Sequence, residues 1–296
     1  TVIDAEDAGR ILRLAAGAKA SNLTLANFQM LSAMAQVTTL RGVALDARHA
    51  VVEDCIIRDG KVGAVKSWEH YIYLEGTVMR RTTVANCRYT GTETAIWGNS
   101  AGVAIYALSQ SVLEDVTVED CRTKGGNSGG KSIAAPVVLS DSSMSHSIVR
   151  RNSECYAESA SSAGGLLLYG ASALTDTLVE SNSVAQHHSG SVVGGVNMNA
   201  SSTAAIDRCI IRGNSMGSSL QNTPTVAGGI LASYGSTLRN CLVYGNSGPA
   251  SASTAVASGS AGGVAMRSNS GSATGRMENC TVYGNTLAYN PNAAGV

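Results

Sequence analysis

One motif recurs along the chain at a nearly constant interval, and this repeat constrains the fold more than any other feature. The motif runs from an apolar residue through two polar residues, a small residue or cysteine and a branched aliphatic residue, and most copies end in asparagine. Its clearest copies span 238–246 and 277–285. The small-residue position recurs at 23, 55, 82, 116, 147, 177, 209, 241 and 280, so successive copies lie 27 to 39 residues apart. The chain is therefore a repeat protein with a period near 32 residues.

A second motif, two glycines followed by alternating apolar residues, precedes several copies of the first, as at 194–198 and 262–266. Both motifs alternate over four or five positions, which is the side-chain period of a β-strand. Two or three short strands per period, with turn residues between them, describe one coil of a β-solenoid. Leucine-rich repeats share the period, but the chain lacks a leucine consensus and a helix-forming stretch. We predict an all-β fold, a parallel β-helix of about nine coils forming a single domain over 1–296.

Aligning the coils predicts columns of stacked side chains. Two positions after the small residue every coil has a branched aliphatic residue, which suits an inward-facing strand position. This column contains Leu25, Ile57, Val84, Val118, Val149, Val179, Ile211, Val243 and Val282. Another column is asparagine on five consecutive coils, and stacked asparagine amides can hydrogen-bond to one another. We interpret it as a structural ladder made of Asn152, Asn182, Asn214, Asn246 and Asn285.

Charged residues alternate in sign along the predicted stack. One such column contains Asp54, Arg81, Asp115, His146, Asp176 and Arg208. Opposite charges one strand apart support strand pairing, so this alternation is typical of a solvated, self-neutralising sheet face. Over the whole chain Lys+Arg and Asp+Glu both total 21, which argues against a general role in binding nucleic acid or anionic membranes. No apolar run approaches the roughly 20 residues that cross a bilayer, so we expect no membrane span.

One group of charged residues could support catalysis on a polysaccharide. Carboxylates gathered on one exterior face, with a basic residue nearby, are what such an enzyme needs. The best candidates are Glu114, Asp115, Glu119, Asp120 and Arg150. The alternative is the compensated charge ladder described above, and we favour that interpretation because opposite charges lie one coil away.

The strand after the Gly-Gly motif suggests a different site, a ligand-binding face. Its outward column should be apolar and uncharged, and it should contain Ala44, Tyr73, Ala104, Val138, Leu167, Asn197, Leu231 and Ala265. Aromatic side chains over a flat sheet can hold sugar rings or a protein partner. The residues that we expect to bind are Trp68, Tyr73, Trp97, Tyr106, Leu167 and Tyr169. The alternative is that loops fold over this face and bury it.

The seven cysteines show no pattern of a metal site or a disulfide framework. Stacked neighbours on parallel strands lie about 4.8 Å apart, which is wider than a disulfide prefers. We expect buried thiols that fill small apolar positions. There is no Cys-x-x-Cys pair, and the adjacent His187 and His188 lie in a Ser/Gly-rich stretch, so we expect neither a metal site nor a cofactor.

The two motifs together resemble the repeats of chlamydial polymorphic outer-membrane proteins, which pair Gly-Gly-Ala/Ile with Phe-x-x-Asn. The segment 279–285, Asn-Cys-Thr-Val-Tyr-Gly-Asn, is still more similar to β-helix repeat proteins that environmental bacteria secrete. The wider pectate-lyase-like superfamily implies a right-handed coil, in agreement with the handedness of parallel crossovers. Its uronate lyases imply a calcium site and a Lys or Arg base if this chain were an enzyme.

From these features we expect a non-catalytic secreted or cell-surface protein of the adhesin or structural type, which binds a carbohydrate or protein surface. A lyase or hydrolase acting on an acidic polysaccharide is the alternative. Residues 1–4 match the second half of a strand motif and 293–296 the start of the next, and neither end has a polar cap. We therefore expect a fragment of a longer repeat protein, whose open ends could stack on another copy.

Overall fold

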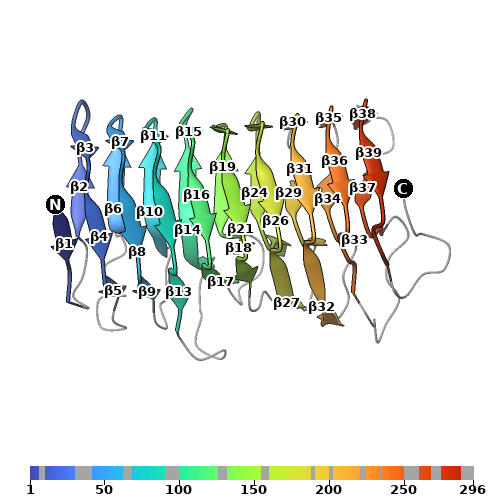
Figure 1. The fold of residues 1–296 in the computed structure, drawn as a ribbon, viewed down its shortest axis with the longest axis horizontal. Coiled ribbons are helices and arrows are strands. Elements are labelled where there is room, and N and C mark those ends of the chain that lie inside the picture. The colour runs from blue at the N-terminus through green and yellow to red at the C-terminus, as the bar shows by residue number, and fades with distance from the viewer. Residues whose placement is uncertain are drawn as a thin grey trace.

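In the computed structural model, the chain winds into coils that stack along one axis, from the N-terminal strands at one end to the C-terminal strands at the other (Figure 1). The structure describes residues 1–6, 11–30, 42–62, 69–90, 100–125, 132–154, 160–187, 191–199, 203–220, 225–233, 235–249, 260–267 and 275–287. Within these residues all regular elements are β-strands. Equivalent strands of successive coils pair in parallel, as in Val84 with Ile57 and Val118. The predicted fold class, an all-β parallel solenoid, is confirmed.

Each coil contributes strands to sheets that run the length of the stack. Sheet I contains β2 (Leu12–Leu14), β6 (Gly42–Arg48), β10 (Glu69–Glu75), β14 (Ser100–Leu108), β19 (Val137–Ser140), β24 (Leu166–Tyr169), β29 (Val196–Met198), β34 (Ile230–Ala232) and β37 (Val264–Met266). Sheet II contains β3 (Lys19–Ser21), β7 (Val51–Glu53), β11 (Val78–Arg80), β15 (Val112–Glu114), β20 (Ser143–Ser145), β25 (Ala173–Thr175), β30 (Ala205–Asp207), β35 (Thr237–Arg239) and β38 (Arg276–Glu278). Sheet III contains β1 (Val2–Asp4), β4 (Thr24–Ala26), β8 (Ile56–Arg58), β12 (Thr83–Ala85), β16 (Thr117–Glu119), β21 (Ile148–Arg150), β26 (Leu178–Glu180), β31 (Ile210–Arg212), β36 (Leu242–Tyr244) and β39 (Thr281–Tyr283).

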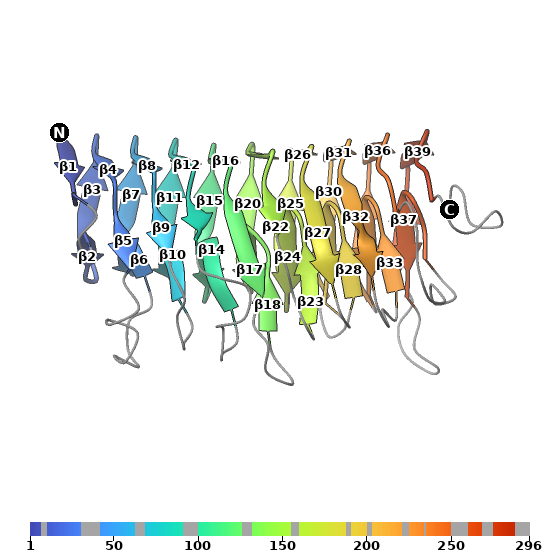
Figure 2. The same ribbon diagram turned by 90° about the horizontal axis from the view of Figure 1, so that it is seen from below.

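Two smaller sets of strands complete the coils. Sheet IV follows sheet III along the chain and contains β5 (Gln29–Met30), β9 (Lys61–Val62), β13 (Arg88–Tyr89), β17 (Arg122–Gly125), β22 (Ser153–Glu154), β27 (Ser183–His187) and β32 (Ser215–Leu220). Sheet V contains β18 (Ser132–Ala134), β23 (Ala160–Ala163), β28 (Ser191–Val193) and β33 (Thr225–Ala227). The strands of sheet V lie side by side at one margin of the stack (Figure 2).

The short strands of sheets II and III end at corners that need left-handed backbone. The corner between sheets II and III has a residue with positive φ on every coil, namely Asn22, Asp54, Arg81, Asp115, His146, Asp176, Arg208, Asn240 and Asn279. Most members are Asn or Asp, which tolerate this conformation better than other non-glycine residues. The alternating charged column therefore lies at a corner of the coil, where each side chain points into solvent.

The core is a thin column of aliphatic side chains enclosed by sheets I, II and III. Middle residues of the three-residue strands point inward; Val84, Val118, Val149, Val179 and Val243 have no exposed surface. Each of these residues pairs in register with its equivalent on the next coil, as in Val149 with Val179. The inward column predicted for sheet III is confirmed.

The Gly-Gly motif marks a close approach between coils. A Cβ atom on Gly195 would lie 2.4 Å from the carbonyl oxygen of Gly229 and 3.2 Å from Nδ2 of Asn214. Gly165 and Gly229 stand in the same relation to Asn182 and Asn246. The two motifs therefore recur together because the glycines leave the space that the asparagine amides occupy.

The outward column predicted for sheet I is wrong at two positions. Tyr73 pairs with Asp46, not with Ala44, and Val138 pairs with Tyr106, not with Ala104. The observed pairing differs from the predicted pairing by two residues at both positions, and the register also shifts by one residue within β10 against each of its neighbours. A shift of two residues keeps the same face outward, so the alternation pattern alone does not reveal it.

Candidate functional site

The carboxylates proposed as catalytic candidates lie on sheets II and III and at their corners, and most of them are in ion pairs. Oε2 of Glu119 lies 2.8 Å from Nε of Arg150 and 2.8 Å from Nη2 of Arg151. Asp120 receives two hydrogen bonds from Arg151, at 3.0 and 2.7 Å. These interactions hold both carboxylates against basic side chains of the next coil.

The remaining members of this group do not complete an acid-base pair. Glu114 lies 3.2 Å from Arg80, and Asp115 occupies the left-handed corner between sheets II and III. The hydrogen bonds from Arg151 lower the pKa of Asp120, so this carboxyl is ionised at neutral pH and cannot serve as a general acid. Across the described part of the chain, no three His, Cys, Asp or Glu side chains are grouped closely enough to hold a metal ion.

The expected aromatic face is largely covered. Tyr73 is 4% exposed and Leu167 is fully buried. Val138 and Leu167 pack with Ala135 and Ala163, which lie next to or within strands of sheet V. Farther along the stack, Asn197 donates a hydrogen bond of 3.1 Å to the backbone oxygen of Ser162 in β23. Of the two alternatives for this face, the structure shows the one in which other segments bury it.

The aromatic rings of Tyr73 and Tyr106 pack against neighbouring side chains. The ring of Tyr106 stacks on His70 with centroids 4.4 Å apart and on Tyr73 with centroids 6.1 Å apart. The guanidinium of Arg48 covers the ring of Tyr73 at 5.7 Å. Tyr169 is half-buried, and its burial raises the pKa of its hydroxyl. A sugar ring needs an open aromatic face for stacking, so this row of rings is built for internal packing.

Some residues that the sequence analysis singled out can be compared with the structure only in part. Trp68 and Trp97 lie outside the described residues, as does His188. His187 ends β27 and is not in a loop. The six cysteines within the described ranges are free thiols, and five of them are buried: Cys55, Cys87, Cys121, Cys209 and Cys241.

The asparagine column forms a buried hydrogen-bonded ladder. The backbone N–H of Asn182 donates to Oδ1 of Asn214 at 3.1 Å, and Nδ2 of Asn182 donates to the same oxygen at 3.0 Å. The same pattern joins Asn152 to Asn182, Asn214 to Asn246 and Asn246 to Asn285. Each amide also donates to a backbone carbonyl, as Asn214 does to Val179 at 3.0 Å. Every polar atom of these amides is used inside the solenoid, so the ladder is structural.

A second ladder, made of hydroxyl groups, was not predicted. The backbone N–H groups of Thr77, Ser111 and Ser142 donate to the hydroxyl oxygens of Ser111, Ser142 and Ser172 on the following coils, at 3.1 to 3.3 Å. All four residues are buried. A serine or threonine directly before the four successive strands β11, β15, β20 and β25 of sheet II is the signal that sequence reasoning could have used.

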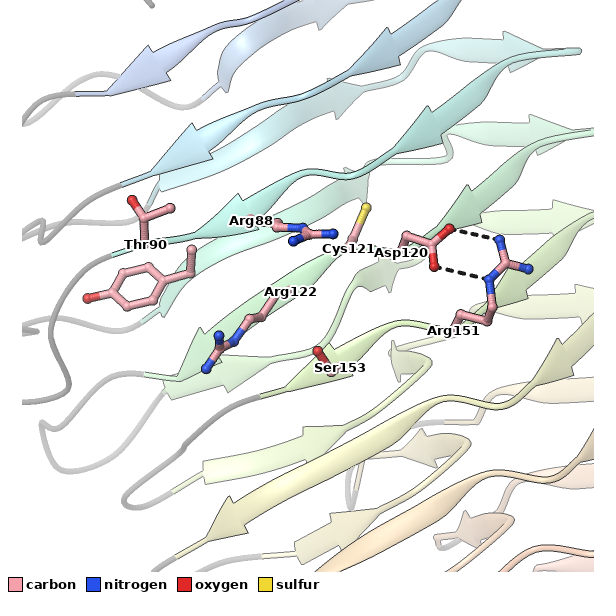
Figure 3. Close-up of a pocket in the computed structure, with 8 residues that line it drawn as sticks. Arg88, Thr90, Asp120, Cys121, Arg122, Arg151 and Ser153 are labelled. Carbon is pink, nitrogen blue, oxygen red and sulfur yellow. Dashed lines mark hydrogen bonds and ion pairs between the residues drawn. The ribbon is translucent and has the colours of Figure 1, made fainter.

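The structure also brings together basic residues that the sequence analysis did not single out. Arg88 pairs in register with Arg122 on one side and with Lys61 on the other, so three cations stack on consecutive strands of sheet IV. Arg88 and Arg122 are exposed and line a hollow of about 440 Å³ together with Arg151. In Figure 3, Arg88, Arg122 and Ser153 follow one another across neighbouring strands, with Arg151 holding Asp120 to one side.

The lining of this hollow also includes two buried residues, Tyr89 and Cys121. Tyr89 is 4% exposed, and the ammonium group of Lys124 lies 5.4 Å from its ring centroid. Cys121 is 1% exposed, and its backbone N–H donates to Asn152 at the start of the asparagine ladder. Sequence reasoning could have found the two basic residues, because Arg88 directly follows Cys87 and Arg122 directly follows Cys121. The alignment of coils places these two positions in one outward column.

No protein-family model matches the chain, and no curated protein or solved structure is significantly similar to it. The likeness to secreted and outer-membrane repeats therefore rests on the short motifs and on the solenoid fold. Among the described residues, no helix is long and apolar enough to cross a bilayer.

Proposed function

We propose that this chain is a non-catalytic part of a secreted or cell-surface protein, in which the solenoid is a rigid scaffold that presents a ligand-binding surface. The observation that carries the proposal is the pairing of the candidate catalytic carboxylates. Glu119 and Asp120 are engaged by Arg150 and Arg151 of the next coil, and Glu114 is engaged by Arg80 of the preceding coil.

Catalysis on a polysaccharide would require a carboxyl with a raised pKa or a set of carboxylates free to hold calcium. The pKa of Asp120 is lowered by Arg151, and arginines occupy the oxygens of Glu119 and Glu114. The repeated ion pairs instead stabilise neighbouring coils against each other. A rod with a regular core and with paired charges on sheets II and III suits a spacer or an adhesin-type passenger. The location outside the cell is supported by the resemblance of the motifs to secreted and surface repeats.

The test is an incubation with acidic and neutral polysaccharides, with and without calcium, in which both product formation and retention of the polymer are measured. We expect no products under any condition. Cleavage that disappears in Asp120→Ala but persists in Asp207→Ala would contradict the proposal. Asp207 is a matched control because it is a half-exposed carboxylate that also contacts an arginine, Arg208.

A further inference from the structure

The basic residues of sheet IV break the charge pattern of the rest of the solenoid. At the corners and on sheet III, cations face carboxylates one coil away, as Arg81 faces Asp54 at 2.6 Å. On sheet IV, Arg88 and Arg122 stack in register on successive strands, about 4.8 Å apart. Like charges in register destabilise a sheet. A ligand that carries negative charge would remove this repulsion.

The two arginines are also available to a ligand. Within the described residues, neither Arg88 nor Arg122 makes an ion pair with a carboxylate, although both are exposed. The arginines of sheet III and its corners, by contrast, are held by carboxylates, as Arg150 is by Glu119. The guanidinium group presents a planar fork of N–H donors, which matches the oxygens of an anionic group.

The hollow supplies further donors around these forks. Its lining includes the hydroxyl-bearing residues Thr90 and Ser153, so three successive coils contribute polar groups to one site. Its volume of about 440 Å³ falls in the range of small-ligand sites, roughly 300–1,000 Å³. The site is therefore large enough for a sugar residue that carries a charged substituent.

Asp120 is the one acidic residue in the lining, and its charge is compensated. Both of its oxygens accept hydrogen bonds from Arg151. The lining has a formal net charge of +2, because it contains three arginines, Arg88, Arg122 and Arg151, and one aspartate, Asp120. Asp120 holds Arg151 to one side of the hollow and also attracts Arg88 electrostatically. Arg88 and Arg122 are the two arginines of the lining that make no ion pair among the described residues.

We propose that this hollow binds a tetrahedral oxyanion ester, a sulfate or phosphate group carried on a glycan. A phosphate monoester carries close to two negative charges at neutral pH and matches the net charge, whereas a sulfate monoester carries one. Both esters present three free oxygens in a tetrahedral arrangement, one oxygen more than a planar carboxylate, to donors that come from several coils. The inference rests on the proposed non-catalytic, ligand-presenting function and names the chemical class of the ligand. Arg88 and Arg122 bind the ester, and Thr90 and Ser153 hydrogen-bond to it or to the sugar.

The experiment measures binding of the whole chain to four polymers of similar length: dextran sulfate, phosphorylated dextran, polygalacturonate and neutral dextran. We expect binding of at least one of the two esters, about tenfold weaker binding of polygalacturonate, and no binding of neutral dextran. A preference between sulfate and phosphate supports the proposal and identifies the ester. Failure to bind either ester, or equal binding of polygalacturonate, would overturn it.

Variants separate a defined site from diffuse attraction. Arg88→Gln and Arg122→Gln should each lower the affinity for the preferred ester about tenfold or more, as expected for the loss of a charge-assisted hydrogen bond. Arg239→Gln is the matched control, because Arg239 is exposed on sheet II and its loss changes the net charge equally. The double variant R88K/R122K keeps both charges but removes both forks. We expect it to bind weakly as well, and wild-type affinity in this variant would contradict the proposal.

The same mixtures are assayed for product formation, so that two failures can be told apart. Ester binding without cleavage supports both the site and the non-catalytic function. Cleavage of a bound polymer overturns the non-catalytic function while the variants still report on the site. Absence of ester binding, with no cleavage, overturns only the site.

Discussion

At the scale of single residues, the interior accepts polar groups because each one is bonded to the next coil. Asn214 is fully buried, yet its amide donates to Val179 and to Asn246 while its oxygen accepts from Asn182. Burying such a group without partners would cost several kcal/mol. His70 is a contrasting case, since it is 2% exposed and its Nδ1 has no hydrogen-bond partner among the described residues.

Replacing Asn214 by alanine should lower the free energy of unfolding by about 3 kcal/mol, because a buried N–H and a buried carbonyl lose their partners. The measurement is chemical denaturation of the wild type and the variant. Asn199→Ala is the control, because its amide is half-exposed and lies outside the ladder, with a long hydrogen bond of 3.4 Å to Ser161. Equal losses in both variants would show that the ladder adds no special stability.

His70 should make stability depend on pH. Burial lowers the pKa of His70 to about 3, which is below its value of about 6.5 in an unfolded chain. The unfolded state therefore binds more protons, and stability is lost as the pH falls below about 6.5, by at most about 1.4 kcal/mol per pH unit.

The measurement for His70 is the unfolding free energy of the wild type and of His70→Phe between neutral and mildly acidic pH. Phenylalanine keeps the stacking on Tyr106 but cannot titrate. The wild type should lose more stability than the variant on acidification. Parallel pH profiles would show that His70 is accessible to protons in the folded chain.

At the scale of elements, the stack is held at a close spacing by small residues. The Gly-Gly pairs leave no room for a Cβ atom, and they face the asparagine ladder across the coil. Corner residues with positive φ end the strands of sheets II and III after three residues on each coil. The length of these strands is therefore set by the corners, and the distance between coils at the ladder is set by the glycines.

Gly195→Ala should destabilise the chain by several kcal/mol, because the new Cβ atom would lie 2.4 Å from the backbone oxygen of Gly229. Gly284→Ala is the control. Nothing lies within 4 Å of a Cβ atom there, and its φ of 59° costs an alanine only about 1 kcal/mol. Thermal denaturation of both variants makes the comparison. A larger loss for Gly284→Ala would mean that backbone strain outweighs the space between coils.

At the scale of the whole molecule, each coil contacts mainly its two neighbours, so stability should vary along the stack. Buried thiols are distributed along its length. Cys55 directly precedes β8 near the N-terminal end of the stack, and Cys241 directly precedes β36 near the C-terminal end. Burial raises the pKa of Cys209 and Cys241 to about 12, which keeps both thiols protonated and unreactive in the folded chain. Alkylation of these thiols therefore reports local unfolding.

Val243→Asp places a charge in the fully buried inward column and should cost several kcal/mol. We expect Cys241 to be alkylated at a lower denaturant concentration than Cys55 in this variant, because the damage is confined to neighbouring coils. Leu242→Asp is the control, since Leu242 lies on the same strand with its side chain half-exposed. Simultaneous alkylation of both thiols would show that the solenoid unfolds as one cooperative unit.

Much of the fold could be predicted because the repeat is a linear property of the chain. The aliphatic column from Leu25 to Val282 and the alternating charges follow from spacing alone, since parallel strands in register place equivalent residues side by side. The candidate sites were harder to predict. Tyr73 and Leu167 face outward as expected, but periodicity does not reveal which segments cover that face.

The sequence by itself determined the solenoid, its strand register over most of the stack and the asparagine column, because these depend on local alternation and a constant period. Only the tertiary structure decided which outward faces meet solvent, since covering sheet I depends on where the segments between strands pack. It also decided that Arg88, Arg122 and Arg151 share one hollow. Arg88 and Arg122 are the first residues of β13 and β17, whereas Arg151 lies at the left-handed corner before β22. The three arginines therefore occupy different positions in their coils, and the geometry of the corner brings them together.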